Sequence, residues 1–406
     1  MERTSTSDWL SPEFFASPYP FYDKLRRSDP VHWSDRLGSW ILTRYEDVTW
    51  ALRNHQRLIN SGRIASILDQ LPQKDRERMR PLYRHFSGGL IHSDRPDHTR
   101  LRMLVNKAFA PGAVESMRSR IQAIVNELLD EVEKSEGMDV IRDFAYPLPT
   151  IVICDILGLP PGDREQFKGW SDGIIELTAV SPLTVEAADR ARRSLLELRE
   201  YFARLVADRR QNPRSDMLSL LVAAEEQGDR LSLAELLSTS VTLLVAGHET
   251  TTHLIGNGLF ALLQHPDQFQ KLKDNPTLMT SAIEEFLRYN SPLQRQLRKA
   301  AGTIEIGGKQ IREGDLVSVM LGAANRDPAE FAEPDRLDIT RAENHHVSFG
   351  MGIHFCLGAP LARIEGPVAL STLLSRFPAM RLGGDSFEWQ HDIAFRGLRA
   401  LPILFD

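Results

Sequence analysis

Apolar residues recur at helical spacing through most of the chain, with charged residues between them. Segments 114–134 and 190–210 show this pattern clearly, and each predicts an amphipathic helix. Segment 231–266 is longer and is apolar on nearly all sides through its middle, so we expect a helix that runs through the interior of the protein. Ser232 and Glu235 have the spacing of a capping box, which predicts where this helix begins.

Strand patterns are fewer and shorter. Segment 30–48 predicts a hairpin that turns at Gly38, and segment 302–321 predicts short strands joined by glycine turns. No proline- or serine-rich linker, low-complexity run or internal repeat divides the sequence. A length of 406 residues would by itself favour two or three domains. The even scatter of turns instead predicts a mainly α fold with a small β portion (α+β), as one domain over residues 1–406 with a long central helix.

Composition narrows the possible partners and compartment. The chain is 42% apolar and 26% charged, which is ordinary for a globular protein. Its net charge of −6 disfavours nucleic acid or an anionic membrane as the main partner. Two cysteines cannot build a disulfide framework, and the N-terminus shows no signal-peptide pattern. The uncharged stretch 236–247 is shorter than the roughly 20 residues that cross a bilayer. We therefore expect a cytoplasmic protein without a membrane anchor.

The segment 347–366, VSFGMGIHFCLGAPLARIEG, places Cys356 just after two glycines and just before a helical pattern. Backbone N–H groups and the helix dipole at such a position favour an anion, so we expect a bias toward the thiolate. Gly350 and Gly352 would let the preceding loop turn tightly. No second cysteine or paired histidine lies at zinc spacing, and a lone thiolate ligand suits haem iron. The alternative is a small buried cysteine behind a glycine turn.

The long central helix carries polar residues in its apolar middle, in the run Ala246-Gly247-His248-Glu249-Thr250-Thr251. Glu249 and Thr250 are costly to bury unless they meet water, each other or a ligand. Gly247 would let a flat ligand or small molecule lie against the helix. His248 and His253 have no partner at metal spacing and are not interpreted as ligands. A polar patch at a helix kink is the alternative interpretation of this run.

The segment around Cys356 resembles the haem-binding loop of the cytochrome P450 family, and the resemblance extends over nearly the whole chain with separate motifs in the expected order. It implies haem b (iron protoporphyrin IX) as the cofactor and Cys356 as the proximal iron ligand. Phe349 would pack near the sulfur, and Gly358 belongs to the same cofactor-binding loop.

The run in the central helix resembles the oxygen-activation site of that family. The resemblance implies that Ala246 and Gly247 lie over the haem. Thr250 would hydrogen-bond the dioxygen, and Glu249 would help to relay protons. These two side chains are the predicted catalytic residues.

Further motifs gain a meaning from the same resemblance. Glu285 and Arg288, three residues apart, would by themselves be read as a solvated surface pair. In this order they look like the Glu-x-x-Arg element of the family, and Arg336 would complete a three-residue ionic cluster that supports the cysteine loop. The resemblance assigns four donors to the haem propionates: His98, Arg102, Arg298 and His354.

The region from about 60 to 92 matches the place of the substrate loop in the family. Mostly apolar walls are usual for small-molecule pockets. The apolar and neighbouring residues that we expect to line the substrate pocket are Ile67, Leu68, Phe86, Val245, Leu293, Gln294 and Phe395. These residues do not identify a substrate beyond a hydrophobic small molecule.

The sequence therefore predicts a haem-thiolate monooxygenase that inserts one oxygen atom from dioxygen into a hydrophobic small molecule by hydroxylation or epoxidation. Its electrons would come from separate proteins, a ferredoxin and ferredoxin reductase or a flavodoxin. One alternative is a peroxygenase that uses hydrogen peroxide, although the Glu249–Thr250 pair argues against it because peroxide already carries the protons and electrons. The others are a haem-based sensor or carrier without turnover, and a helical protein without a cofactor.

Overall fold

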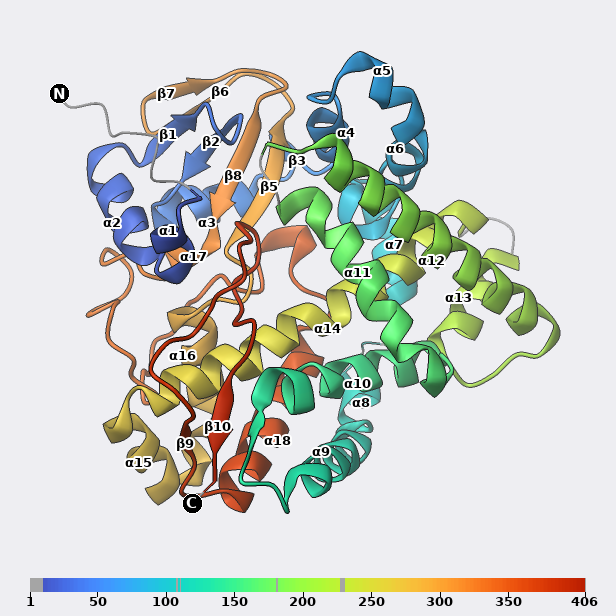
Figure 1. Cartoon of the computed structure of the whole chain (residues 1–406). Helices are drawn as coiled ribbons and strands as arrows, with labels where there is room; N and C mark the ends of the chain where they lie inside the picture. Colours follow the sequence, from blue (N-terminus) through green and yellow to red (C-terminus); the bar gives the residue numbers. More distant parts are fainter. Residues whose placement is uncertain (1–9, 107–108, 110, 180–181, 227–230, 406) are drawn as a thin grey trace.

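Helices dominate the computed structural model of the chain, the largest sheet lies to one side of them, and a smaller sheet lies near the C-terminus (Figure 1). The structure describes residues 10–106, 109, 111–179, 182–226 and 231–405. The α-helices are α1 (Pro12–Ala16), α2 (Tyr19–Ser28), α3 (Tyr45–Arg53), α4 (Arg63–Leu68), α5 (Gln73–Arg76), α6 (Arg80–Phe86), α7 (Asp97–Asn106), α8 (Pro111–Glu115), α9 (Arg118–Val132), α10 (Pro147–Leu157), α11 (Arg164–Ala179), α12 (Val185–Gln211), α13 (Met217–Glu226), α14 (Leu233–Leu263), α15 (Pro266–Asp274), α16 (Met279–Tyr289), α17 (Leu321–Ala324) and α18 (Ala359–Arg376). The strands are β1 (Val31–Ser34), β2 (Ser39–Leu42), β3 (Leu58–Ile59), β4 (Gly137–Asp139), β5 (Arg295–Ala300), β6 (Ile304–Ile306), β7 (Lys309–Ile311), β8 (Leu316–Met320), β9 (Arg381–Leu382) and β10 (Pro402–Leu404).

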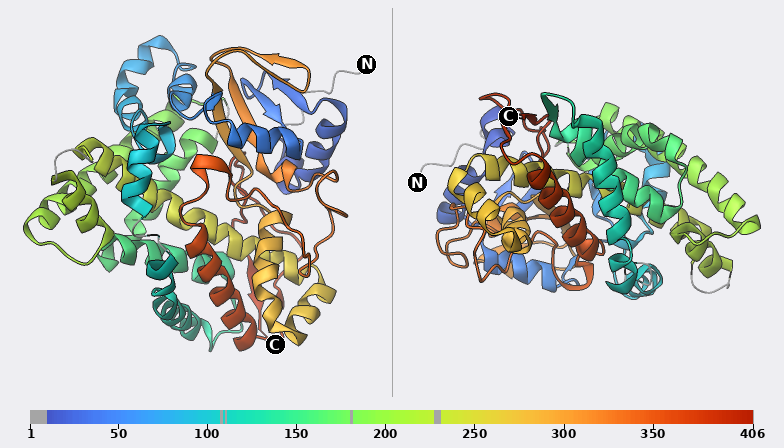
Figure 2. Two further views of the ribbon diagram at one scale, coloured as in Figure 1. Left: turned by 180° about the vertical axis from the view of Figure 1, so that it is seen from behind. Right: turned by 90° about the horizontal axis from the view of Figure 1, so that it is seen from below.

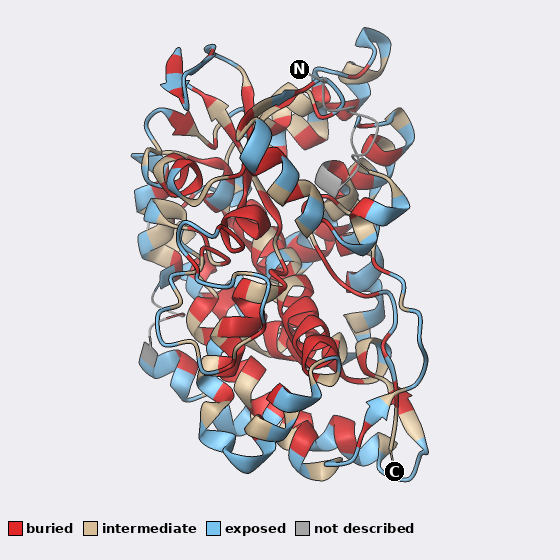
Figure 3. Ribbon diagram, turned by 90° about the vertical axis from the view of Figure 1, so that its left-hand side faces the viewer, coloured by how far each residue is buried: buried red, intermediate tan, exposed pale blue. Residues whose placement is uncertain are grey.

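The predicted central helix is α14, which crosses the middle of the molecule (Figure 1). It begins at the predicted capping box. The Ser232 hydroxyl accepts a hydrogen bond from the Glu235 backbone N–H, and the Glu235 side chain accepts one from the Ser232 backbone N–H. These reciprocal bonds satisfy N–H groups that the first helical turn leaves free. Most side chains of the helix are buried, as its apolar sequence predicts (Figure 3).

The other predicted helices are also present, with one difference. Segment 190–210 lies within α12, whereas segment 114–134 is divided into the end of α8 and the whole of α9. The amphipathic pattern runs across the break without marking it. Helices are thus predicted well from periodicity, but a short non-helical step between two of them is not.

The largest sheet has five strands in the order β1-β2-β8-β5-β3. Its neighbouring strands are antiparallel except β2 and β8, which are parallel. The predicted hairpin over 30–48 is the β1–β2 pair, and Gly38 has a positive φ of 57° in the turn. Strands β6, β7 and β8 form the predicted strands of segment 302–321. Strands β6 and β7 form a two-stranded sheet, and the other small sheet joins β4, β10 and β9. The mainly α fold with a small β portion is confirmed.

Two hydrophobic cores meet at the predicted cysteine loop. One core lies under the five-stranded sheet, and a larger one lies among the helices around α14. Figure 2 shows the part with this sheet beside the helical part from two further sides. Val347 and Met351 pack with the sheet core, whereas Phe349 and Leu357 pack against the helical core. The loop that carries Cys356 is therefore held between the two parts of the fold.

Candidate functional site

The loop before Cys356 is closed by backbone hydrogen bonds. Gly350 N–H donates to the Val347 carbonyl at 2.8 Å, and Cys356 N–H donates to the Phe349 carbonyl at 2.9 Å. Gly350 and Gly352 both have a φ of 69°, in the left-handed region that glycine adopts most readily. A Cβ on Gly352 would also lie 2.8 Å from the Leu52 carbonyl oxygen. Both predicted glycines are thus required by the shape of the loop.

Cys356 lies just before α18, as predicted, but its free thiol is not biased toward the thiolate. Burial raises the pKa of Cys356, and this effect outweighs the backbone N–H groups of Gly358 and Ala359 and the charges of Arg102 and Arg363. In the chain alone, burial thus opposes the predicted bias toward the thiolate. The N–H groups are nevertheless in place, and a bound metal cation would supply the remaining stabilisation.

Phe349, the aromatic residue of the loop, lies under a guanidinium. The Arg363 guanidinium is 4.7 Å from the centroid of the Phe349 ring. Arg363 also pairs with both carboxylate oxygens of Glu284 at 2.8 Å, and His346 lies 3.0 Å from the same carboxylate. These contacts tie α18 to α16 and fix the loop between them.

One face of α14 looks toward the side of the molecule that holds Cys356. Leu254 packs against α18 at Gly366, where a Cβ would lie 3.4 Å from the leucine side chain. Thr250 and Ala246 occupy nearly the same face one and two turns earlier. Ala246 is exposed and Thr250 is partly exposed, although most of the helix is buried. Open space therefore adjoins this face, and the Thr250 hydroxyl donates back to the Ala246 carbonyl at 3.3 Å, as its sequence position allowed.

Gly247 points elsewhere. A Cβ at this position would lie 2.7 Å from Ile153 Cγ1 of α10. The missing side chain lets two helices approach each other. The contact with α10 is thus a further reason for glycine at this position, the predicted place of Gly247 over the haem stays a prediction, and Ala246 is the small residue that faces open space.

The Glu249 carboxylate turns away from Thr250. Its Oε1 lies 3.0 Å from Nε2 of His253, one turn further along α14, and its Oε2 lies 3.9 Å from Nε2 of His248. Burial opposes ionisation of Glu249, but the contact with His253 keeps its pKa below the usual range. The sequence carried a signal for the His253 contact, because residues four apart share a helix face.

The four predicted propionate donors come together from three segments. The His98 and His354 rings have centroids 4.2 Å apart, and their Nε2 atoms are buried with no hydrogen-bond partner among the described residues. Arg298, on β5, is 3% exposed, and burial lowers its pKa to about 9. Burial, with the Arg298 charge next in size, lowers the pKa of His354 to about 2. Arg102 lies one turn after His98 on α7, with its charge near both His98 and Cys356.

Arg63 belongs to the same group and was missed from the sequence. Its guanidinium donates to the Leu297 and Ile91 carbonyls at 3.2 and 3.0 Å and lies 3.4 Å from His92 Nδ1. Burial lowers its pKa to about 10. The local sequence offers no signal, since Arg63 is one of several arginines in a polar segment and only the fold brings it near Arg298.

This donor group has no counter-charge of its own. Within the described part of the chain, Arg63 and Arg298 form no ion pair with a carboxylate. Asp94 is the nearby acid, at 4.0 Å from His354, and it already accepts backbone hydrogen bonds from Asn60 and Ser61. Buried cations without a counter-ion are costly, so the arrangement fits a bound ligand with carboxylates.

Comparison with known proteins decides the family. The family model described as Cytochrome P450 matches residues 58–380. The chain is 41% identical to cytochrome P450 CYP107DY1 of Priestia megaterium over the whole of both chains. It is 39% identical to the 6-deoxyerythronolide B hydroxylase of Saccharopolyspora erythraea, covering 99% of this chain and 100% of the relative. The chain belongs to the cytochrome P450 family.

A solved cytochrome P450 structure agrees. P450BioI, in complex with an acyl carrier protein ligated to hexadec-9Z-enoic acid, superposes with a TM-score of 0.89 at 39% identity, covering 97% of this chain and 100% of that one. The chain is thus a cytochrome P450 monooxygenase with a haem-thiolate cofactor. Its residues fit that group, since a thiol in a glycine-shaped loop, an exposed alanine on an interior helix and buried unpaired cations all border the same part of the molecule. No helix in the described ranges has the length and apolar character to span a bilayer.

The Glu-x-x-Arg element of this cytochrome P450 is buried, not a solvated pair. Glu285 and Arg288 have no exposed surface and join at 2.8 and 2.9 Å. The third ionic partner is Arg341, whose Nε lies 3.2 Å from Glu285. The prediction of Arg336 was wrong, because its exposed side chain pairs with Glu333 and only its carbonyl accepts from Arg288.

The predicted pocket residues of the cytochrome P450 divide into two groups. Leu68 has no exposed surface and lies in the core, and Gln294 is 3% exposed with its side chain packed against Gly322. Neither lines open space, so the structure contradicts both predictions. The partly exposed residues, which remain predictions, are Ile67, Phe86, Val245, Leu293 and Phe395. Leu293 and Phe395 form an antiparallel bridge and lie side by side.

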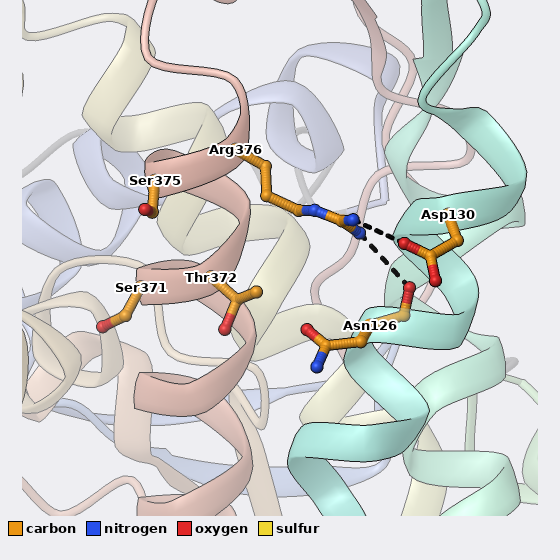
Figure 4. A pocket seen from close by; sticks show the side chains of 6 residues that line it. All are labelled: Asn126, Asp130, Ser371, Thr372, Ser375 and Arg376. Carbon is orange, nitrogen blue, oxygen red and sulfur yellow. Dashed lines mark hydrogen bonds and ion pairs between the residues drawn. The ribbon is translucent and has the colours of Figure 1, made fainter.

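A separate hollow of about 470 Å³ lies between α9 and the C-terminal half of α18 (Figure 4). Its side chains are polar, and Arg376 crosses it to the Asp130 carboxylate and the Asn126 carbonyl. It is far along α18 from Cys356. This polar surface hollow is therefore not part of the haem site.

Proposed function

We propose that Thr250 and Glu249 serve dioxygen activation in this cytochrome P450, and that the product is a hydroxylated or epoxidised hydrophobic small molecule. The supporting observation is the position of Thr250 on an open face of α14, beside Ala246 and toward the end of α18 that follows Cys356. When bound, haem supplies the redox chemistry, and the side chains bind, orient and protonate.

Each part of the site would hold one part of the cofactor. Cys356 would ligate the iron, with the N–H groups of Gly358 and Ala359 directed at its sulfur. The residues proposed to hold the propionates are His98, Arg102, Arg298 and His354, to which we add Arg63. Guanidinium groups suit carboxylates because they donate in a planar fork.

Thr250 and Glu249 would divide the work on protons. The Thr250 hydroxyl has a flexible donor on the open face of α14, while the Glu249 carboxylate reaches the opposite side. A carboxylate beside the site relays protons only when dioxygen must be reduced. Hydrogen peroxide would already carry those protons, so this pair favours dioxygen as the oxidant over the peroxygenase alternative.

Electrons are proposed to come from a ferredoxin and ferredoxin reductase, or a flavodoxin, in the cytoplasm. The 406 residues present align over their full length with a relative that is named only as a cytochrome P450. This alignment supports our proposal that residues 1–406 form one catalytic domain. Turnover in the presence of either donor, and none without one, tests this proposal.

The substrate class is approached by spectral titration. Partly exposed apolar residues at Ile67, Phe86, Val245, Leu293 and Phe395 support a hydrophobic ligand. We propose to titrate the haem-loaded protein with 6-deoxyerythronolide B, hexadec-9Z-enoic acid and its acyl carrier protein thioester. A shift of the haem absorption identifies a ligand, and product analysis with a donor then decides the reaction.

The central test is spectroscopic and chemical. The ferrous carbon monoxide adduct should show the long-wavelength Soret band of thiolate coordination, and Cys356→Ser should lose it. A product that forms with dioxygen and a donor chain supports the monooxygenase. Turnover with peroxide alone would favour the peroxygenase, and binding without turnover would favour a sensor or carrier.

A further inference from the structure

A large cavity approaches α14 from the side opposite Thr250. Its volume is about 1330 Å³, and its walls come from α9, α10, α11, α12 and the C-terminal segment. From α14 itself, Glu249 and Thr252 line it. Glu249 is 9% exposed, so its carboxylate reaches the cavity edge from an otherwise buried position. Water in this cavity can therefore meet Glu249 without entering the proposed haem site.

His253 holds this carboxylate from within the helix. Its ring is 1% exposed, and Nε2 lies 3.0 Å from Glu249 Oε1. The other side of the ring is pressed against the backbone at Gly397, where an added Cβ would lie 1.9 Å from Nδ1. Gly397 thus limits rotation of the ring, so its Nε2 stays in close ion-pair contact with Glu249 Oε1, although the two atoms are not aligned as a hydrogen bond.

His248 is placed differently. Its Nδ1 lies 2.8 Å from the Leu244 carbonyl and donates to it, which fixes the hydrogen on that nitrogen. Its Nε2 is 3.9 Å from Glu249, beyond hydrogen-bond range. His253 is therefore the histidine that touches the carboxylate.

The remaining groups around Glu249 do not replace His253. Asp172 and Lys168 of α11 line the cavity, and so does Tyr146, which directly precedes α10. From the C-terminal segment, Gln390 hydrogen-bonds Glu249, and Asp392 accepts from backbone N–H groups of its own loop. Burial, and next the Glu249 charge, raise the pKa of Asp172. His253 is the basic side chain in contact with the Glu249 carboxylate.

We propose that His253 is a positioning residue for dioxygen activation, which stores the proton that Glu249 delivers and is refilled from water in the cavity. In the first proton transfer, the imidazolium Nε2–H passes its proton to Glu249 Oε1. The side chain then carries the proton, as a carboxylic acid, toward Thr250. A proton from cavity water returns to the carboxylate and restores the imidazolium, and no electron moves in these steps.

The inference rests on the proposed roles of Glu249 and Thr250, and its first test does not depend on turnover. Protein with ¹³C-labelled histidine, loaded with haem and in the diamagnetic ferrous carbon monoxide form, is titrated by NMR. His253→Gln assigns the ring, or His253→Asn if the glutamine variant does not fold. We expect a protonated His253 ring at neutral pH and a titration midpoint at least about one pH unit lower in Glu249→Gln. A neutral ring, or an unchanged midpoint, overturns the proposal.

The second test uses dioxygen alone as the probe. NADPH consumption is measured with a ferredoxin and ferredoxin reductase, without added substrate, in protein that retains its carbon monoxide spectrum. We expect His253→Gln to slow consumption by about tenfold and to increase its solvent deuterium isotope effect. The matched control is His265→Gln, two residues after the end of the same helix, whose ring contacts the Ala261 carbonyl of that helix.

The outcomes separate the two proposals. Equal rates in His253→Gln and the wild type, when the wild type consumes NADPH, overturn the His253 role alone. If the wild type consumes none, the proposed function fails, while the NMR midpoint still decides whether His253 stores the proton. A slow rate in His265→Gln as well would assign the effect to the helix and would also overturn the His253 role.

Discussion

Glu285 and Arg288 form an ion pair in which neither side chain has any exposed surface. Glu285 also accepts from the Asp338 backbone N–H, and Arg288 donates to the Asn325 and Pro334 carbonyls. The pair therefore fixes the chain that leads from β8 to the cysteine loop. The stability of the fold requires both partners of this pair, because a buried charge without its partner is far more costly than the pair.

Glu285→Ala should destabilise the protein by about 3–5 kcal/mol, since it leaves Arg288 buried without a counter-charge. Arg336→Ala should change the free energy of unfolding by no more than about 0.5 kcal/mol, because its side chain is exposed. Denaturant unfolding of the haem-loaded protein measures both. Equal losses of unfolding free energy in the two variants would contradict the ionic cluster described here, in which Arg341 pairs with Glu285 and Arg336 does not.

Gly352→Ala should distort the cysteine loop, because the residue has a positive φ and its new methyl would lie 2.8 Å from the Leu52 carbonyl. We expect a lower melting temperature and a lower haem content. Gly384→Ala is the control, since a Cβ there meets nothing within 4 Å. Haem absorbance per protein checks the result, and normal haem content in Gly352→Ala would show that the loop tolerates the change.

Arg298→Ala and Arg63→Ala should each weaken haem retention, because each removes a guanidinium, buried at Arg298 and partly buried at Arg63, that forms no ion pair with a carboxylate among the described residues. In the protein without haem, removing such an unpaired cation also removes the cost of its desolvation. We therefore expect the haem-free variants to have unchanged or higher thermal stability. Lys299→Ala, the next residue on β5, is the matched control. The rate of haem transfer to apomyoglobin measures retention, and unchanged rates would remove both arginines from the propionate site.

The stability of the protein should fall as pH rises toward about 8 because of Glu365. This residue is 1% exposed, neither carboxylate oxygen has a hydrogen-bond partner among the described residues, and burial raises its pKa to about 8. The folded form then keeps a proton that the unfolded form releases above the ordinary pKa of a glutamate, 4.5. Stability from this group is therefore complete at low pH and decreases between these two values.

Glu365→Gln removes that pH dependence, since the amide stays neutral. Its free energy of unfolding should equal that of the wild type near pH 4.5. At about pH 8 and above, the variant should be more stable than the wild type. Unfolding curves across this range measure the difference, with the exposed Glu343→Gln as control. If the difference in unfolding free energy between the wild type and Glu365→Gln does not change with pH, Glu365 is solvated or paired, and this prediction fails.

The sequence alone determined the elements and the ligand residue. A capping box followed by an apolar run defined α14, because helix caps and periodicity act within a few residues of each other. The positions of Gly350, Gly352 and Cys356 predicted a tight loop before a helix, since glycine's freedom at positive φ is a local property. The resemblance of the motifs to those of a known family then predicted the cofactor and the family membership.

Only the tertiary structure decided which distant groups meet and what their burial does. Arg341 replaces Arg336 at Glu285, Arg63 joins Arg298, and Gly247 faces Ile153, none of which follows from spacing along the chain. The thiol of Cys356 was predicted as anionic from its helix position, yet burial outweighs that local effect. Local rules fix what a segment forms, whereas charge and desolvation energies depend on neighbours that folding brings from far away in the sequence.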